Sequence, residues 1–300
     1  MPARKTFQQA LRSKEFVLTA QLQLNEHTGR RGVIKQAQCL SAAVDAICVA
    51  ANPHGVVHMA GLAAASLLIA NDIDPVLHVA SRDRNRIALR SELLGAAAIG
   101  VTSLVVQRGD RLSTEYRQSA WKGKKVGSVK LLGVAKQLSN YQTQHNEPEL
   151  FLGTLATVIE PGDDWQPRVL LKKADAGAQF VQTKICLDMA KLRRYMAAVV
   201  GARITHRCQF VVSVPVLPSA DAARWLNENL RSEAIPESIV TKLDAARSPE
   251  QLGIEIAAEF LRELQDIPGV GGANLVTPGE IETISAVINA AGSQGRRPRQ

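Results

Sequence analysis

Polar residues that could take part in ligand chemistry follow directly on strand-length apolar runs of this sequence. His78 lies near the end of one such run, and the next run ends at Arg108, Gly109 and Asp110. A glycine at this point would let the backbone approach a ligand closely, with the carboxylate of Asp110 presented beside it. Side chains gathered at the carboxyl ends of parallel strands are where α/β folds place their chemistry. We therefore predict a ligand site built from these strand ends.

The same arrangement recurs along the chain. Further polar residues at or just after predicted strand ends are Gln21, Glu26, His27, Asn52, His54, Thr154, Lys184 and Asn274. Each residue alone is typical of a solvated loop, so the prediction depends on their shared position. The net charge of +8 would attract an anionic small molecule to such a site.

The elements that would position these residues alternate between strand and helix. Residues 75–80 and 102–106 are strand-like, and residues 85–98 have the apolar spacing of a helix. Such a unit predicts parallel strands with a right-handed crossover. Further strands are predicted at 16–22, 45–50, 149–154, 179–183, 209–213 and 273–276. Further helices are predicted at 33–43, 56–70, 129–142, 166–176, 187–200, 220–230, 249–264 and 278–291.

Eight strand–helix alternations predict an α/β fold of the (β/α)8 TIM-barrel type. An open doubly wound sheet is the alternative, but it should carry a glycine-rich turn, and the sequence has no G-x-G-x-x-G. We predict one barrel domain over residues 1–291 and a disordered basic tail over residues 292–300. The polar stretch 111–125 is long for an α/β connection, so we expect it to be functional or mobile.

Composition excludes several classes of function. No apolar run could span a bilayer, and the opening residues lack the apolar core of a secretory signal, so a cytoplasmic protein is expected. Aromatic residues make up only 4% and do not interleave with the basic clusters, so no nucleic-acid partner is expected. The sequence contains no zinc, P-loop, nucleophile-elbow or EF-hand motif, and we predict no metal.

The chain resembles the methylenetetrahydrofolate reductase family over about residues 15 to 290. The resemblance lies in the strand ending at His78, the strand ending at Arg108-Gly109-Asp110, and the segments 173–178, with Thr183 after it, and 215–218. It implies a barrel that holds FAD, takes electrons from NADH or NADPH, and reduces methylenetetrahydrofolate to 5-methyltetrahydrofolate. It also implies an enzyme of a family whose barrels are commonly oligomeric.

The resemblance implies specific roles. His78, Arg108, Gly109, Asp110 and Thr154 would bind the cofactor, and Lys173 would approach its phosphate or ribose region. Asp110 would also act in catalysis, because a carboxylate stabilises the cationic iminium form of the folate in a dry site.

Several positions depart from the family pattern. Gln21 replaces the glutamate that serves as the acid, and Lys184 replaces a folate-contacting glutamine. Ala50, Ala51, Leu155 and Ile159 replace residues that contact the flavin in the family. Losing a general acid costs on the order of 10²–10⁴ in rate, so Glu26 or Lys184 is expected to supply the proton.

Three functions remain open from the sequence. The first is a flavin-dependent reductase of this type with a displaced proton donor. The second is a divergent paralogue that acts on another pterin or methylated C1 substrate, including in the oxidative direction. The third is a catalytically inactive barrel that serves as a subunit of a C1-enzyme complex.

Overall fold

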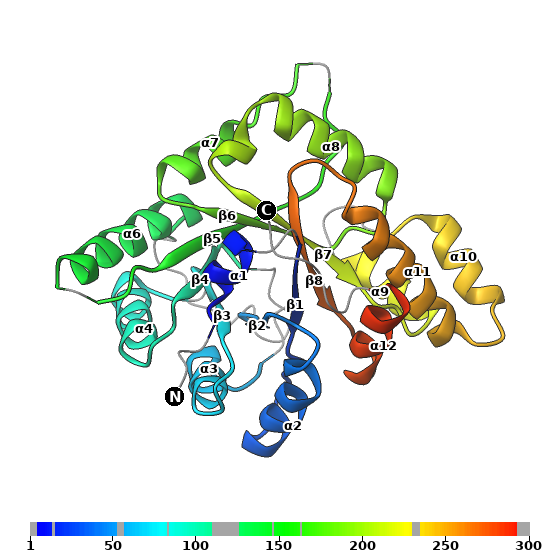
Figure 1. The fold of residues 1–300 in the computed structure, drawn as a ribbon, viewed down its shortest axis with the longest axis horizontal. Coiled ribbons are helices and arrows are strands. Elements are labelled where there is room, and N and C mark those ends of the chain that lie inside the picture. The colour runs from blue at the N-terminus through cyan, green and yellow to red at the C-terminus, as the bar shows by residue number, and fades with distance from the viewer. Residues whose placement is uncertain are drawn as a thin grey trace.

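Eight parallel strands close into a barrel in the computed structural model (Figure 1). Each strand pairs with its neighbours in sequence order, and the last strand pairs with the first. The strands are β1 (Val17–Gln21), β2 (Ala46–Val49), β3 (Pro75–Ala80), β4 (Ser103–Gln107), β5 (Phe151–Ala156), β6 (Phe180–Thr183), β7 (Gln209–Pro215) and β8 (Val270–Val276). The predicted (β/α)8 barrel is thus confirmed.

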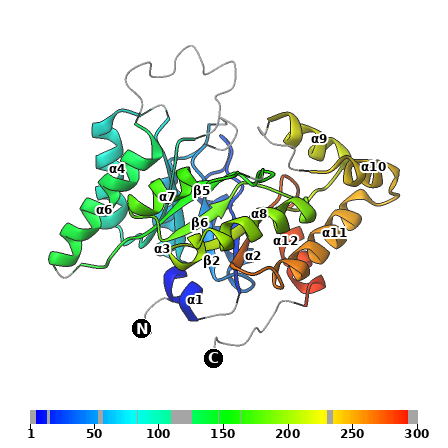
Figure 2. The same cartoon turned by 90° about the horizontal axis from the view of Figure 1, so that it is seen from above.

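The structure describes residues 5–13, 16–52, 57–82, 84–109, 126–145, 147–162, 164–229 and 235–292. In Figures 1 and 2 helices surround the barrel, and one short helix lies at one of its ends. They are α1 (Phe7–Ser13), α2 (Arg30–Ser41), α3 (Gly61–Ile69), α4 (Arg86–Ala98), α6 (Ser128–Gln144), α7 (Arg168–Asp175), α8 (Met189–Gly201), α9 (Ala220–Asn229), α10 (Glu237–Ala245), α11 (Pro249–Leu264) and α12 (Glu282–Ala290). In the described part of the chain, no helix combines the length and apolar character needed to cross a membrane.

Two apolar clusters divide the strand residues by the alternation of side chains across a sheet. The larger cluster contains Leu104 and Val106 of β4 and fills the space between barrel and helices. The smaller cluster contains Val105 of β4 together with Phe151 and Phe180, and it fills the barrel interior. Away from the register irregularity where β7 pairs with the start of β8, this alternation gives the side-chain direction of the strand residues.

Helix α1 closes the amino-terminal end of the barrel and was not predicted from the sequence. Phe7, Ala10 and Leu11 belong to the interior cluster, and the Phe7 ring lies 5.2 Å from that of Phe180. The backbone N–H of Phe7 also donates to Oδ2 of buried Asp74 at 2.7 Å. The apolar residues of α1 have the spacing of a helix face, but the segment is too short for this pattern to stand out in the sequence.

Some predicted boundaries were wrong. Strand β8 begins at Val270 rather than at residue 273, and it includes Gly272, which lies against the backbone of Val17 where any Cβ would clash. Strand β5 runs to Ala156, two residues beyond the prediction. The segment 111–125 and the tail after Gly292 lie outside the described residues.

Candidate functional site

The alternation of side chains places a set of polar residues inside the barrel towards its carboxyl end. Hydrogen bonding between strands continues past β6, because the Lys184 N–H donates to the Ala156 carbonyl at 2.7 Å. Lys184 therefore points to the same side as Gln182 and Phe180. The polar interior residues are Thr19, Gln21, His78, Gln107, Gln182, Lys184, Ser213 and Asn274.

A belt of uncharged polar side chains crosses the interior. The Thr19 hydroxyl donates to Oδ1 of Asn274 at 3.0 Å, and the amide groups of Asn274 and Gln182 donate to Oγ of Ser213 at 3.5 and 3.4 Å. The Cys48 thiol completes the belt with a contact of 3.9 Å to Oε1 of Gln182. Burial raises the pKa of Cys48 to about 12, so the belt stays uncharged near neutral pH.

Sequence reasoning found only Asn274 of this belt. Thr19, Gln182 and Ser213 lie within predicted strands. Each precedes a strand-end residue by two positions (Gln21, Lys184 and Pro215), and this spacing was the signal that could have placed it on the same face of the sheet. Their contacts depend on which residues stand opposite one another in neighbouring strands. Asn274 pairs with both Thr19 and Ser213 across the sheet.

Two lysines meet at the rim of the barrel near the end of β5. The Lys173 ammonium donates to the Leu155 carbonyl at 2.6 Å, and Lys184 binds the next carbonyl through its backbone N–H. Burial lowers the pKa of Lys173, and the positive charge of Lys184 lowers it further. Two cations at one rim form a natural contact for an anionic group.

Gly109 lies at the end of β4 in a backbone conformation that favours glycine, with φ of +90°. Its carbonyl accepts a hydrogen bond of 2.8 Å from the Arg82 guanidinium. A Cβ atom at this position would lie 3.2 Å from the Cβ atoms of both Ala80 and Arg82. Arg108 is exposed, and Asp110 lies outside the described residues. The hydrogen bond between Arg82 and Gly109 thus joins the segments that follow β3 and β4.

We expect Gly109→Ala to lower the free energy of unfolding by about 1–2 kcal/mol, because an L side chain is strained at this φ. Urea denaturation would measure this loss. Gly133→Ala is the matched control, since a Cβ there meets no atom within 4 Å. It should leave stability unchanged or raise it by about 0.5–1 kcal/mol. Equal stability of the two variants would contradict the account of Gly109.

The remaining predicted residues have different surroundings. His78 is buried inside the barrel, and Gln21 is half-buried at the end of β1. Glu26 is exposed and pairs at 3.5 Å with exposed His27. The Thr154 hydroxyl donates to the Val106 carbonyl at 3.1 Å on the helix-facing side of the sheet. Its predicted role in cofactor binding stays a prediction.

The closed parallel barrel, with its polar residues at the carboxyl end, defines a TIM-barrel protein whose candidate site lies at that end. A sequence model of methylenetetrahydrofolate reductase matches residues 7–292, nearly the whole chain. The chain belongs to the methylenetetrahydrofolate reductase family, as the resemblance predicted. A comparison with curated protein sequences finds no match.

Solved structures share the fold. An uncharacterised protein from Clostridium thermocellum, which binds two copies of 5-methyl-5,6,7,8-tetrahydrofolic acid, superposes with a TM-score of 0.68 at 12% identity. The match covers 95% of this chain and 98% of that chain. A GH18 chitinase from Cycas revoluta gives a TM-score of 0.52 at 10% identity, covering 92% of this chain and 99% of that one. At these identities the likeness concerns the fold alone.

Proposed function

We propose that this protein is a flavin-dependent oxidoreductase that reduces methylenetetrahydrofolate to 5-methyltetrahydrofolate with NADH or NADPH. Family membership supports the substrate class. The similar structure from Clostridium thermocellum binds the proposed product. The observation that carries the proposal is the inward direction of Lys184 at the carboxyl end of the barrel, because it gives the interior an ionisable group while Gln21 stands at the position of the family glutamate.

The residues of the mouth are compatible with FAD. Lys173 offers a positive charge for the diphosphate, and Gly109 provides close approach of the backbone. His78, Arg108 and Asp110 are the further cofactor-binding residues of the proposal. When bound, FAD supplies the hydride that it receives from NADH or NADPH.

We assign the proton to Lys184 rather than to Glu26. Opening of the folate imidazolidine ring requires a proton on the departing nitrogen, and the Gln21 amide cannot supply one. Glu26 is exposed in the loop after β1, whereas Lys184 is half-buried on the inward side of β6. Its ammonium would donate one proton from Nζ to that nitrogen and recover it from solvent.

The proposal predicts that reduced folates stabilise the protein. A ligand at a hundred times its dissociation constant raises the free energy of unfolding by about 2.7 kcal/mol. Thermal melting with 5-methyltetrahydrofolate should therefore show a clear upward shift, and the purified protein should show the absorbance of oxidised flavin that bleaches with NADH or NADPH. A flavin-containing protein whose melting temperature changes with no folate would contradict the proposed substrate class.

One observation favours a second candidate. The amide of Gln21 stands where the family has an acid, which a reaction without ring opening would not need. A divergent paralogue that acts on another pterin or methylated C1 substrate meets that condition. It predicts a yellow protein whose melting shift is larger with a different pterin. A colourless protein without pterin binding would instead favour an inactive subunit of a C1-enzyme complex.

A further inference from the structure

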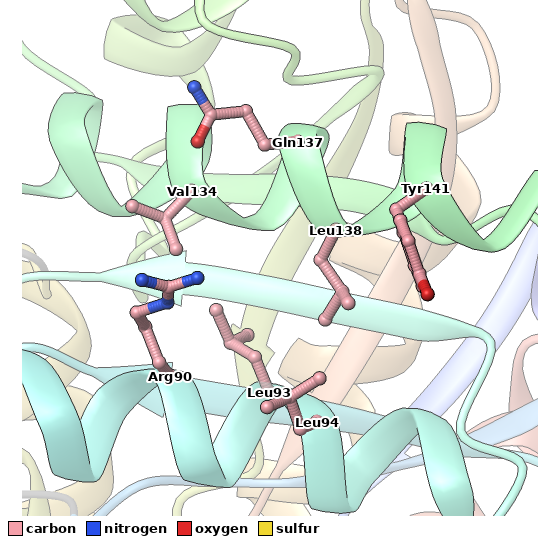
Figure 3. A pocket seen from close by; sticks show the side chains of 7 residues that line it. All are labelled: Arg90, Leu93, Leu94, Val134, Gln137, Leu138 and Tyr141. Carbon is pink, nitrogen blue, oxygen red and sulfur yellow. The ribbon is translucent and has the colours of Figure 1, made fainter.

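A groove runs between α4 and α6 on the outside of the barrel, away from the candidate site (Figure 3). It encloses about 310 Å³, with Leu93, Val134 and Leu138 among its apolar walls. Arg90 and Tyr141 stand at its opposite ends. A volume at the low end of small-molecule pockets suits one large side chain better than a cofactor.

Exposed apolar side chains gather around this groove. Leu94 of α4 lines the groove and is 54% exposed, Ile87 of the same helix is 78% exposed, and Tyr141 of α6 lines the groove and is exposed as well. Ile87 and Leu94 are seven residues apart and thus lie on one face of α4. A contiguous exposed apolar patch with a polar edge marks a surface that another protein covers.

The charge around the groove defines the chemistry of its occupant. Exposed basic residues on the groove side of the two helices are Arg86, Arg90 and Lys130. The carboxylate that these helices carry, Glu92, is only 13% exposed and pairs with Arg84. Within the described part of the chain, no ion pair involves Arg90. The occupant should therefore present a large apolar side chain beside a carboxylate.

Helix α9 of this same protein has that combination. Trp225 is 44% exposed, and Glu228 follows it by one helical turn. Among the described residues, the exposed apolar side chains of α7 lie beside Arg168 and Lys172, whose charge would be repelled. Figures 1 and 2 both place α9 on the opposite side of the barrel from α4 and α6. One molecule can thus offer both surfaces to its neighbours.

We propose that α9 of a second copy docks into the α4/α6 groove, with Trp225 in the groove and Glu228 beside Arg90. Tryptophan and arginine are the residue types that most often dominate binding energy at interfaces. The contact joins two different surfaces, so association runs head to tail and forms a ring or an open chain. A symmetric contact between two α4/α6 surfaces would instead oppose their like charges.

Sedimentation velocity of the full-length protein tests this proposal. The average mass of the sedimenting wild-type species should rise with protein concentration. It should fall again at high salt, because salt screens the ion pair. Leu94→Glu, which blocks the groove, and Trp225→Ala, which removes the inserted ring, should each weaken association about tenfold or more. Val169→Glu on exposed α7 is the matched control and should associate like the wild type.

Mixing the two defective variants gives the decisive result. Each variant keeps one intact surface, so an equimolar mixture should form a dimer and nothing larger. Thermal melting confirms that both variants are folded. A wild type that stays monomeric, a Trp225→Ala variant that associates normally, or a mixture without dimer would each overturn the proposal.

Discussion

The Lys184→Ala variant is expected to reduce methylenetetrahydrofolate about 10²–10⁴ times more slowly than the wild type, because it loses the proposed general acid. The loss should appear in kcat. Electron transfer from NADH or NADPH to menadione needs no folate proton and should change little. Parallel assays of both reactions on one preparation would measure the difference. Lys172→Ala, an exposed neighbour of Lys173 on α7, is the matched control for removal of a positive charge.

A second substitution tests the assignment further. If Lys184 is the donor, adding Gln21→Glu to the Lys184→Ala variant restores a carboxylic acid at the position where the family has one. Folate turnover should then recover much of the loss. Unchanged turnover in Lys184→Ala alone would contradict the displaced donor, and failure of the double variant to recover would contradict the role assigned to position 21.

The Phe7→Ala variant is expected to lose about 3–5 kcal/mol of folding free energy, the usual cost of truncating a fully buried phenylalanine. Its ring packs against Phe180 at 5.2 Å and Phe151 at 5.9 Å inside the amino-terminal end of the barrel. The truncation leaves a cavity between rings that cannot easily collapse. Urea denaturation followed by circular dichroism would measure the change.

Phe7→Leu serves as the control for this prediction. It keeps an apolar side chain in the barrel and should cost roughly 1–1.5 kcal/mol, as conservative core substitutions do. A loss below roughly 1 kcal/mol for Phe7→Ala would show that α1 contributes little to the closed barrel.

The order of the elements could be predicted because it depends on local patterns. Val105 and its β-branched neighbours mark a strand buried on both faces, and Gly177, with φ of +113°, follows the end of α7, as glycine often does beyond a helix. Strand β8 was underestimated because glycines weaken a strand pattern. The reason that Gly272 is needed, the backbone of β1 beside it, lies far away in the sequence.

The site was harder to predict than the fold. The position of Lys184 after a strand was visible, but its proximity to Lys173 depends on how α7 packs over the end of β5. The belt of Thr19, Asn274 and Ser213 depends on the register of three strands. Local patterns carry neither kind of information. The roles of Arg108 and Asp110 stay predictions.

Helix α1 also has a kinetic consequence. Phe7 and Leu11 of this helix fill the amino-terminal end of the barrel, and the belt of polar side chains that includes Ser213 crosses the interior above them. Ligands can then enter and leave only at the carboxyl end of the barrel. If the protein uses a nicotinamide and a pterin as proposed, the two would bind at this end in turn, and each would dissociate before the other binds.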